Sequence, residues 1–286
     1  MITSCFSRKN RVIFDLHSHS TASDGVLSPR ELVVRAVAQG VQVLALTDHD
    51  ETRGVVEAEV AARELGIDIV PGVEISVSWS GRTVHIVGLY VDISHAGLHA
   101  GLQANRSGRG DRARRMGEAL AKVGIPGAYE GAYTLAPNKE LISRTHFARF
   151  LVAKGYVKDL KSVFKKFLIK GKPGYVSHQW ASLEDAVRWI RAAGGIAVLA
   201  HPGRYNMGRG KMAALFADFK AAGGEAVEVV TASHTPDQVP VYARYALEYG
   251  LRASCGSDFH APGEGGRELG RMPPMPVACE PVWSGR

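Results

Sequence analysis

Short apolar segments alternate with helical patterns along much of the chain, and this alternation constrains the fold more than any other feature. Three strand-like segments near the N-terminus are RVIFDL, VQVLAL and IDIV, and the helical segments between them are LSPRELVVRAVAQG and residues 52–65. Helical crossovers between consecutive strands require parallel strands with the helices packed outside the sheet. The sequence therefore predicts an α/β fold.

The first of these helices carries clear boundary signals. Ser28 suits the N-cap, Pro29 the first helical position and Glu31 the third, a combination that makes a capping box. Gly40 is predicted to end this helix, and Gly66 is predicted to end the second.

The segment EISVSWSGRTVHIVGLYV departs from the alternation of strands and helices. Apolar and polar residues alternate on both sides of Ser80–Gly81, which predicts a β-hairpin with a two-residue turn at that point. In this register Trp79 lies opposite Arg82, and Glu74 lies opposite Val87.

A basic, mainly helical insertion is predicted from residue 98 to residue 180. The α/β pattern returns with SLEDAVRWIRAAGG, and the segments IAVLA, EAVEVV and LRASCG bring the expected core strands to about seven. The predicted α/β domain therefore has two parts, residues 11–97 and 181–270. An irregular, proline-containing tail is expected over residues 271–286.

The amino-acid composition indicates which binding partners and which cellular compartment to expect. The net charge of +7 favours anionic partners such as phosphate esters, nucleotides or nucleic acid, although an arginine run such as residues 106–115 is typical of a solvated helix face. Three cysteines without a C-x-x-C pair predict no disulfide framework and a cytoplasmic location. The N-terminus lacks an apolar signal segment, no apolar run reaches membrane-spanning length, and no obligate protein partner is inferred.

Histidines and carboxylates follow most of the predicted strands. They are His17, His19, Asp48, His49, Glu74, His201, Asp258 and His260, and His85 lies on the second strand of the hairpin. Because the carboxyl ends of parallel strands meet at one edge of a sheet or barrel, these side chains are expected to converge.

Their spacing favours a metal site. Residues two apart in an extended chain point to the same face, so His17 and His19 can bind one ion, as can Asp258 and His260. Alone, a pair such as His17 and His19 is more often structural or solvated. Imidazole and carboxylate ligands suit Zn²⁺, Mn²⁺ or Fe²⁺ better than Ca²⁺.

The ordered motifs DLHSHSTASDG, ALTDHD, PGVEIS, HIVGL, AHPGRY and GSDFHAP resemble those of the PHP (polymerase and histidinol phosphatase) family. The resemblance covers residues 11–90 and 195–261, on both sides of the insertion. It implies a distorted (β/α)7 barrel with a mainly helical insertion. It also implies a phosphoesterase that uses two or three divalent metal ions, with Mn²⁺ the expected metal and Zn²⁺ or Fe²⁺ the alternatives.

The resemblance also implies roles for individual residues. The first metal site is matched by His17, His19, Glu74 and Asp258. The second is matched by Glu74 as a bridging ligand and by His85 and His201. A third is matched by Asp24, His49 and His260. Some relatives have a histidine at the position of Asp24, so these three residues are alternatively expected to contact the substrate.

The insertion motifs LISRTHFARFLVAKGYV and GKPGYVSHQWASLEDAV resemble a subgroup that removes the 3′-phosphate from 3′,5′-bisphosphonucleotides such as phosphoadenosine phosphate. Related members trim short RNA from the 5′ end. The resemblance places Arg144 and His146 over the metal site, with Arg204 as a second phosphate ligand. Asn105 and Arg106 are expected to meet the second phosphate or the sugar.

The expected chemistry is attack on phosphorus by metal-activated hydroxide. Arg144 neutralises the charge that develops on the phosphoryl oxygens, and Asp24 or His260 protonates the leaving oxygen. The predicted substrate is a small anionic nucleotide, with short RNA as an alternative. Histidinol-phosphate phosphatase, amidohydrolase and a non-catalytic PHP module are the remaining alternatives.

Overall fold

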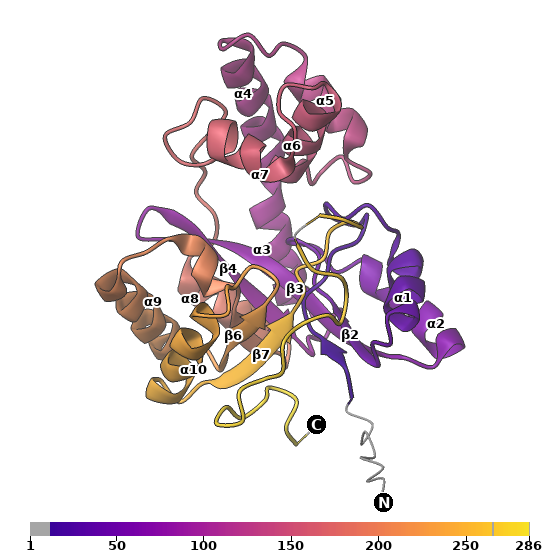
Figure 1. Ribbon diagram of the computed structural model, residues 1–286, viewed down its shortest axis with the longest axis vertical. Coiled ribbons are helices and arrows are strands. Elements are labelled where there is room, and N and C mark those ends of the chain that lie inside the picture. The colour runs from indigo at the N-terminus through magenta and orange to yellow at the C-terminus, as the bar shows by residue number, and fades with distance from the viewer. Residues whose placement is uncertain (1–11, 265, 286) are drawn as a thin grey trace, which may run out of the picture.

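The computed structural model describes residues 12–264 and 266–285, and its centre is a seven-stranded sheet that is nearly closed into a barrel (Figure 1). The strands, in both chain and spatial order, are β1 (Phe14–Asp15), β2 (Val43–Leu46), β3 (Asp68–Trp79), β4 (Arg82–Leu89), β5 (Ile196–Leu199), β6 (Ala226–Thr231) and β7 (Arg252–Gly256).

Six of the seven strands run parallel to at least one neighbour, as the helical crossovers predict. β1, β2 and β3 are parallel, β4 is antiparallel to both β3 and β5, and β5, β6 and β7 are parallel again. The Leu16 N–H donates to Cys255 O at 2.9 Å, and the Asp258 N–H donates to His17 O at 2.9 Å, which joins the first strand segment to the last. The predicted distorted α/β barrel is confirmed.

β3 is one continuous strand where the sequence predicts two separate ones. Its first part, Asp68–Pro71, pairs with β2, and its remainder pairs with β4. Strand β3 changes partner at Gly72, where a Cβ atom would lie 2.9 Å from Gly88 O. The hairpin register is confirmed, with Glu74 opposite Val87.

Helices cover the outside of the barrel, as the alternating pattern predicts. They are α1 (Pro29–Ala38), α2 (Gly54–Leu65), α8 (Leu183–Ala192), α9 (Arg209–Ala221) and α10 (Gln238–Glu248), with a short 3₁₀ helix, η2 (Pro202–Tyr205), between β5 and α9. The predicted capping box of α1 is present: the Ser28 Oγ accepts from the Glu31 N–H at 3.2 Å, and the Glu31 carboxylate accepts from the Ser28 N–H at 2.8 Å.

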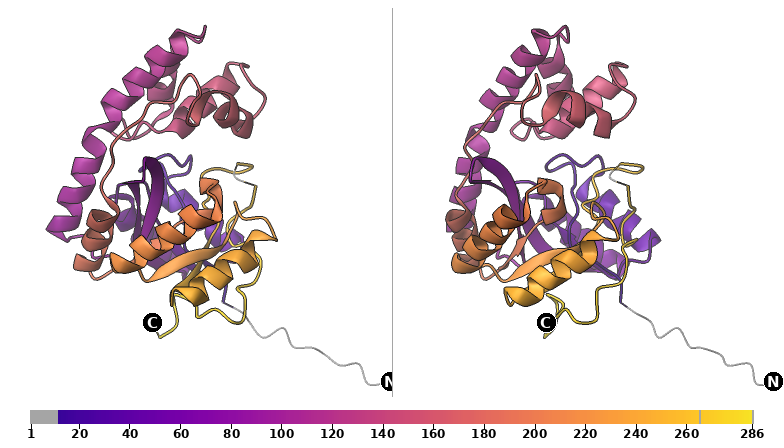
Figure 2. Two further views of the ribbon diagram at one scale, coloured as in Figure 1. Left: turned by 90° about the vertical axis from the view of Figure 1, so that its left-hand side faces the viewer. Right: turned by 60° about the vertical axis from the view of Figure 1, so that its left-hand side comes forward.

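Residues 98–180, which we call the cap, lie above one end of the barrel, and the helical arm of α3 and α4 attaches them at one side (Figure 2). The helices of this region are α3 (Ala96–Ser107), α4 (Arg109–Ala121), α5 (Ala128–Leu135), α6 (Arg144–Ala153), α7 (Leu160–Val163) and the π-helical turn η1 (Phe164–Leu168). The cap has an apolar core of its own, which includes Leu120, Phe147 and Leu151. The division at residues 97 and 180 stays a prediction, because α3 already begins at Ala96.

The C-terminal tail closes the opposite end of the barrel. Trp283 stacks on Phe14 with the ring centroids 4.1 Å apart, and Pro281 forms an isolated bridge with Ala253. Among the described residues, none of the helices is long and apolar enough to span a bilayer.

We predict that Gly256→Ala destabilises the barrel where β7 meets the segment after β1. A Cβ atom at Gly256 would lie 2.3 Å from the Cβ of His17, so the two strands would have to separate. Overpacking of this kind costs about 1–3 kcal/mol of unfolding free energy, which urea denaturation would measure. Gly210→Ala is the control, because its Cβ would meet open space, and an unaltered midpoint for Gly256→Ala would contradict the argument.

Candidate metal centre and active site

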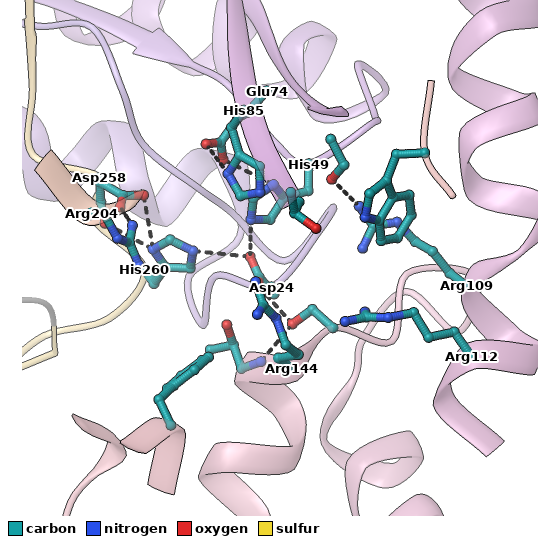
Figure 3. A pocket seen from close by; sticks show the side chains of 16 residues that line it. Asp24, His49, Glu74, His85, Arg109, Arg112, Arg144, Arg204, Asp258 and His260 are labelled. Atoms are coloured by element: carbon teal, nitrogen blue, oxygen red, sulfur yellow. Dashed lines mark hydrogen bonds and ion pairs between the residues drawn. The ribbon is translucent and has the colours of Figure 1, made fainter. Parts of the chain in front are cut away.

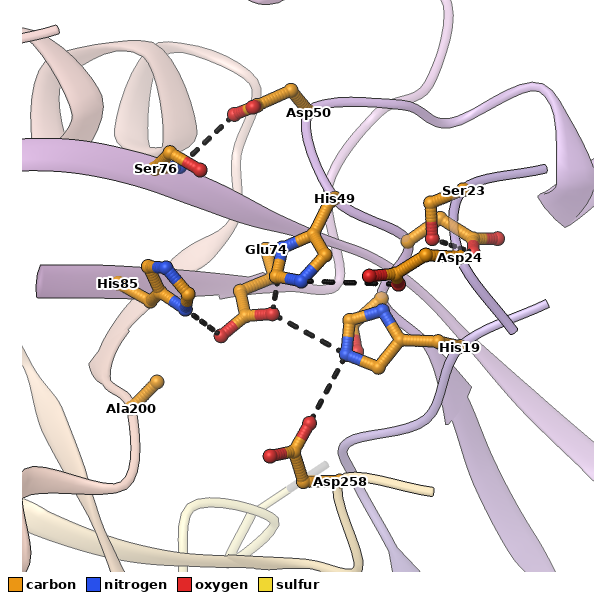
Figure 4. A network of polar contacts seen from close by, with 12 residues as sticks. His19, Ser23, Asp24, His49, Asp50, Glu74, Ser76, His85, Ala200 and Asp258 are labelled. Atoms are coloured by element: carbon orange, nitrogen blue, oxygen red, sulfur yellow. Dashed lines mark hydrogen bonds and ion pairs between the residues drawn. The ribbon is translucent and has the colours of Figure 1, made fainter. Parts of the chain in front are cut away.

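Four side chains converge at the cap-facing end of the barrel, and their ligand atoms form a compact cage. Figure 4 shows three of them, His19, Glu74 and Asp258. The Nε2 atoms of His17 and His19 lie 3.2 Å apart, and each lies 3.3 Å from Glu74 Oε2. Asp258 Oδ1 lies 3.6 Å from the first of these nitrogens and 3.3 Å from the second. These five separations are close to the roughly 3.3–3.4 Å expected between neighbouring ligands of a tetrahedral ion with bonds of about 2.0–2.1 Å.

Glu228 supports this cage from β6, and sequence reasoning missed it. Its Oε1 lies 2.7 Å from His17 Nδ1, and its Oε2 accepts from the His201 N–H at 2.6 Å. A carboxylate behind a ligating imidazole fixes the tautomer, leaving the other ring nitrogen free to bind metal. The only signal in the sequence is a single acid within the apolar strand AVEVVT.

A second group of ligand atoms surrounds the other oxygen of Glu74. His85 Nδ1 lies 2.7 Å from Glu74 Oε1, and His201 Nε2 lies 2.9 Å from the same oxygen. Tyr205 fixes the backbone around both histidines, because its hydroxyl accepts from the His85 N–H at 2.9 Å and donates to Ala200 O at 2.7 Å. The two oxygens of Glu74 therefore face different groups of histidines, and its role as a bridging ligand stays a prediction.

The third group lies on the side of the centre nearest the cap. Asp24 Oδ1 lies 3.3 Å from His260 Nε2 and 3.9 Å from His49 Nε2. His260 Nδ1 lies 2.9 Å from Asp258 O, which leaves its Nε2 free to face Asp24. His49 also lies against the first group, since its Nδ1 is 2.9 Å from Glu74 Oε2.

The electrostatics of these groups suit divalent cations. Within residues 12–264 and 266–285, the buried atoms Asp24 Oδ1 and Glu74 Oε2 accept no hydrogen bond. Burial raises the pKa of Glu74, but the charges of His85 and His49 outweigh it and hold that pKa well below its usual range. Although burial opposes it, the adjacent carboxylates of Asp258 and Glu74 raise the pKa of His19 to about 10. The carboxylates thus favour positive charge at the cage, which a divalent ion supplies in place of a proton.

Four arginines line the pocket that contains these groups (Figure 3). Arg109 is ion-paired with Asp50, and Arg204 is ion-paired with Asp258. Arg112 and Arg144 have no carboxylate within ion-pair distance among the described residues. The Arg112 guanidinium lies 5.4 Å from the Trp180 ring, and its Nε donates to Val176 O at 3.2 Å.

The guanidiniums of Arg112 and Arg144 carry uncompensated positive charge. Burial, together with the neighbouring charges of Arg144 and Arg109, lowers the pKa of Arg112 to about 9. Burial also lowers the pKa of Arg144, with the charge of Arg204 as the next cause. An anion between these groups would relieve both the repulsion and the desolvation.

The structure gives the remaining predicted substrate residues other contacts. Asn105 is buried and donates to Asp50 Oδ1 and Ser76 O, and Arg106 donates to Asp50 O at 2.6 Å. His146 is buried in the capping box of α6, where its Nδ1 accepts from the Ser143 N–H. Asn105, Arg106 and His146 are absent from the lining of the arginine pocket, whereas Arg144 and Arg204 are part of it.

Comparison with known proteins gives consistent matches. The family model for the PHP domain matches residues 15–197. The chain is 56% identical to the 3′,5′-nucleoside bisphosphate phosphatase of Chromobacterium violaceum, over 94% of each chain. It is 49% identical to a 5′-3′ exoribonuclease of Haemophilus influenzae, over 94% of this chain and 97% of the relative.

A solved structure of an amidohydrolase from Chromobacterium violaceum, with bound sulfate and no metal, is also similar. It is 54% identical to this chain, and the two superpose with a TM-score of 0.92 over 95% of each. The likeness therefore extends over the barrel and the cap together.

We predict that Glu228→Gln weakens metal binding without unfolding the protein. The amide keeps the shape of the side chain, but its single acceptor oxygen cannot accept from both His17 Nδ1–H and the His201 N–H, so one of the two supports is lost. Loss of such a partner typically costs roughly tenfold to hundredfold in metal affinity, which calorimetric titration with Mn²⁺ would measure. Glu225→Gln is the control, because that carboxylate pairs with Arg252 near the surface. Equal affinities in the two variants would contradict the role of Glu228.

Proposed function

The chain belongs to the PHP family, and from this premise we propose that it removes the 3′-phosphate of 3′,5′-bisphosphonucleotides, giving a 5′-mononucleotide and phosphate. One observation carries the proposal: the metal-ligand groups share their pocket with the unpaired guanidiniums of Arg112 and Arg144. A substrate with two phosphates can place one at the metal groups and the other at the arginines. The activity of the Chromobacterium violaceum relative supports this assignment.

We further propose two or three Mn²⁺ ions as the cofactors. Glu74 would lie between two of them, with His17, His19 and Asp258 as ligands on one side and His85 and His201 on the other. Bound ions supply hydroxide at neutral pH and polarise the phosphoryl oxygens. The cytoplasm stays the predicted compartment.

His260 is the better candidate for protonating the leaving oxygen, and Asp24 is its partner. Burial raises the pKa of Asp24, but the charges of His260 and His49 outweigh it and hold that pKa well below its usual range. An ionised Asp24 cannot donate a proton, but its Oδ1 lies 3.3 Å from His260 Nε2 and orients that imidazole. Binding of a third metal ion to Asp24, His49 and His260 would replace this proton transfer.

Arg144 faces the metal groups from the N-terminus of α6, and Arg112 faces the pocket from α4. A guanidinium donates two parallel hydrogen bonds to a phosphate, which suits recognition of the phosphate that does not react. Phe164, against which the Arg144 guanidinium lies at 5.8 Å, and Trp180 supply aromatic surface beside the same pocket.

A second candidate function is 5′-3′ exonuclease activity on short RNA, the activity named for the Haemophilus influenzae relative. The specific observation is a run of exposed lysines that continues from the pocket residue Phe164, namely Lys165, Lys166 and Lys170. Attack on the first phosphodiester would release a 5′-mononucleotide by the same chemistry, while the lysines face the phosphates of the remaining strand. Histidinol phosphate fits less well, because its single phosphate is accompanied by a cationic amine.

We expect the Mn²⁺-loaded protein to release phosphate from a 3′,5′-bisphosphonucleotide but not from a 5′-mononucleotide or from histidinol phosphate. A 5′-phosphorylated RNA dinucleotide, followed by chromatography, tests the second candidate. Release from histidinol phosphate alone would overturn the proposed substrate. Absence of any turnover with metals bound would favour a non-catalytic module.

We also predict that Arg144→Gln and Arg112→Gln lower kcat/KM only for substrates that carry the second phosphate. Loss of a charge-assisted hydrogen bond of about 1.5–3 kcal/mol corresponds to roughly a tenfold to hundredfold decrease. The comparison is between a 3′,5′-bisphosphonucleotide and the 3′-mononucleotide in phosphate-release assays. Arg115→Gln, an exposed neighbour on α4, is the control. Equal losses on both substrates would assign these arginines to the reacting phosphate instead.

A further inference from the structure

The cap contacts the two barrel loops that carry Asp24 and His49, two members of the third ligand group. One contact comes from the N-terminus of α6, and the other comes from the junction of α3 and α4. These contacts are direct hydrogen bonds to the ligand residues or to their immediate neighbours, so the position of the cap determines the position of the ligands.

The contact to Asp24 leaves one of its carboxylate oxygens available. Ser143 Oγ donates to Asp24 Oδ2 at 2.7 Å, while Oδ1 is buried and faces His260. The backbone of the same loop is held as well, since Arg149 donates to Asp24 O at 2.6 Å. Asn138 donates to Ala22 O at 2.9 Å. The cap thereby fixes which oxygen of Asp24 points toward the third group.

The contact beside His49 is made through Asp50. Asp50 has a positive φ of 49°, a conformation that non-glycine residues rarely adopt, and its carboxylate is buried. It accepts from the Asn105 side chain at 3.0 Å and is ion-paired with Arg109. The Arg106 side chain donates to its backbone oxygen. These three cap residues hold the strained loop that orients His49.

The other two ligand groups are held differently. Glu228 of the barrel supports His17 and the backbone of His201, and Tyr205 of the barrel supports the backbone of His85. Asp258 is ion-paired with Arg204, which also belongs to the barrel. Displacement of the cap would therefore act directly on the third group, and on the other two only through the backbone hydrogen bonds that join the Asp50 loop to Glu74.

We propose that Ser143 and Arg106 are positioning residues for a third metal site, which is complete only while the cap is docked on the barrel. Arg144 directly follows Ser143 and faces the substrate pocket. Binding of a nucleotide phosphate to the cap and binding of the third ion are consequently coupled, and each raises the affinity of the other by the same factor. This coupling rests on the proposed function, whereas the dependence of the third ion's affinity on Ser143 and Arg106 does not.

The first test is a titration of the metal-free protein with Mn²⁺, in which the electron paramagnetic resonance signal of the free ion gives the number and affinity of the sites. The Asp24→Asn variant is expected to lose one ion, and the affinity that disappears from its titration is that of the third site. In Ser143→Gly and Arg106→Gln we expect the affinity of that ion to fall by roughly tenfold or more, with the other two unchanged. Glycine keeps most of the N-cap preference, and Ser143→Thr restores the hydroxyl, so the third ion should return in that variant.

Ser28→Gly is the matched control, because Ser28 forms the same kind of capping box on α1, away from the metal groups. Its three ion affinities should equal those of the unmodified protein. The proposal is overturned if all three affinities fall together in Ser143→Gly, if none changes, or if the unmodified protein binds only two ions.

The second test repeats the titration with a 5′-mononucleotide, the product of the proposed reaction. We expect the mononucleotide to tighten the third ion in the unmodified protein and to lose that effect in Ser143→Gly. A mononucleotide that binds without changing the third affinity overturns the coupling. A mononucleotide that does not bind contradicts the proposed function, and the first titration still decides the role of Ser143 and Arg106.

Discussion

The site depends on one buried carboxylate, that of Glu74. Its two oxygens contact five histidines, which are His17, His19, His49, His85 and His201. A buried carboxylate is costly unless positive charge or hydrogen bonds compensate it, and the histidines are carried by loops and strands from across the chain. Glu74 lies on β3 just after that strand exchanges β2 for β4, so the irregularity of the barrel places the carboxylate at its centre.

Short sequence motifs predicted those parts of the fold that depend on interactions between residues close in sequence. The capping box at Ser28 and the hairpin register opposite Glu74 depend on residues close in sequence, and both were predicted correctly. The continuity of β3 was missed, because it results from a change of partner strand that no short segment encodes. Similarly, β1 contains only Phe14 and Asp15, although the apolar segment there is longer. Only these two residues pair with β2, and the segment itself does not encode that limit.

The metal-ligand candidates could be predicted because most of them directly follow a strand, and the carboxyl ends of parallel strands lie together at one end of a barrel. Glu228 could not, because its partner His17 is 211 residues away and its neighbours in sequence are apolar. Arg112 was not distinguished from the other arginines of its run, since only burial separates it from the exposed Arg114 and Arg115. Asn105 has the polar groups expected of a substrate ligand, but the fold uses them for Asp50, Ser76 and Ala181.

The distribution of charge explains why the barrel and the cap function together. The barrel contributes carboxylates that require cations, and the cap contributes the guanidiniums of Arg112 and Arg144, which require an anion. Without metal ions, the carboxylates of Asp24, Glu74 and Asp258 on the barrel repel a phosphate. The barrel therefore binds a phosphate only after metal ions have neutralised these carboxylates. The charges then alternate from the barrel carboxylates to the metal ions, the substrate phosphates and the cap arginines. Binding of the metal ions therefore lowers the electrostatic cost of binding the phosphates, and the reverse.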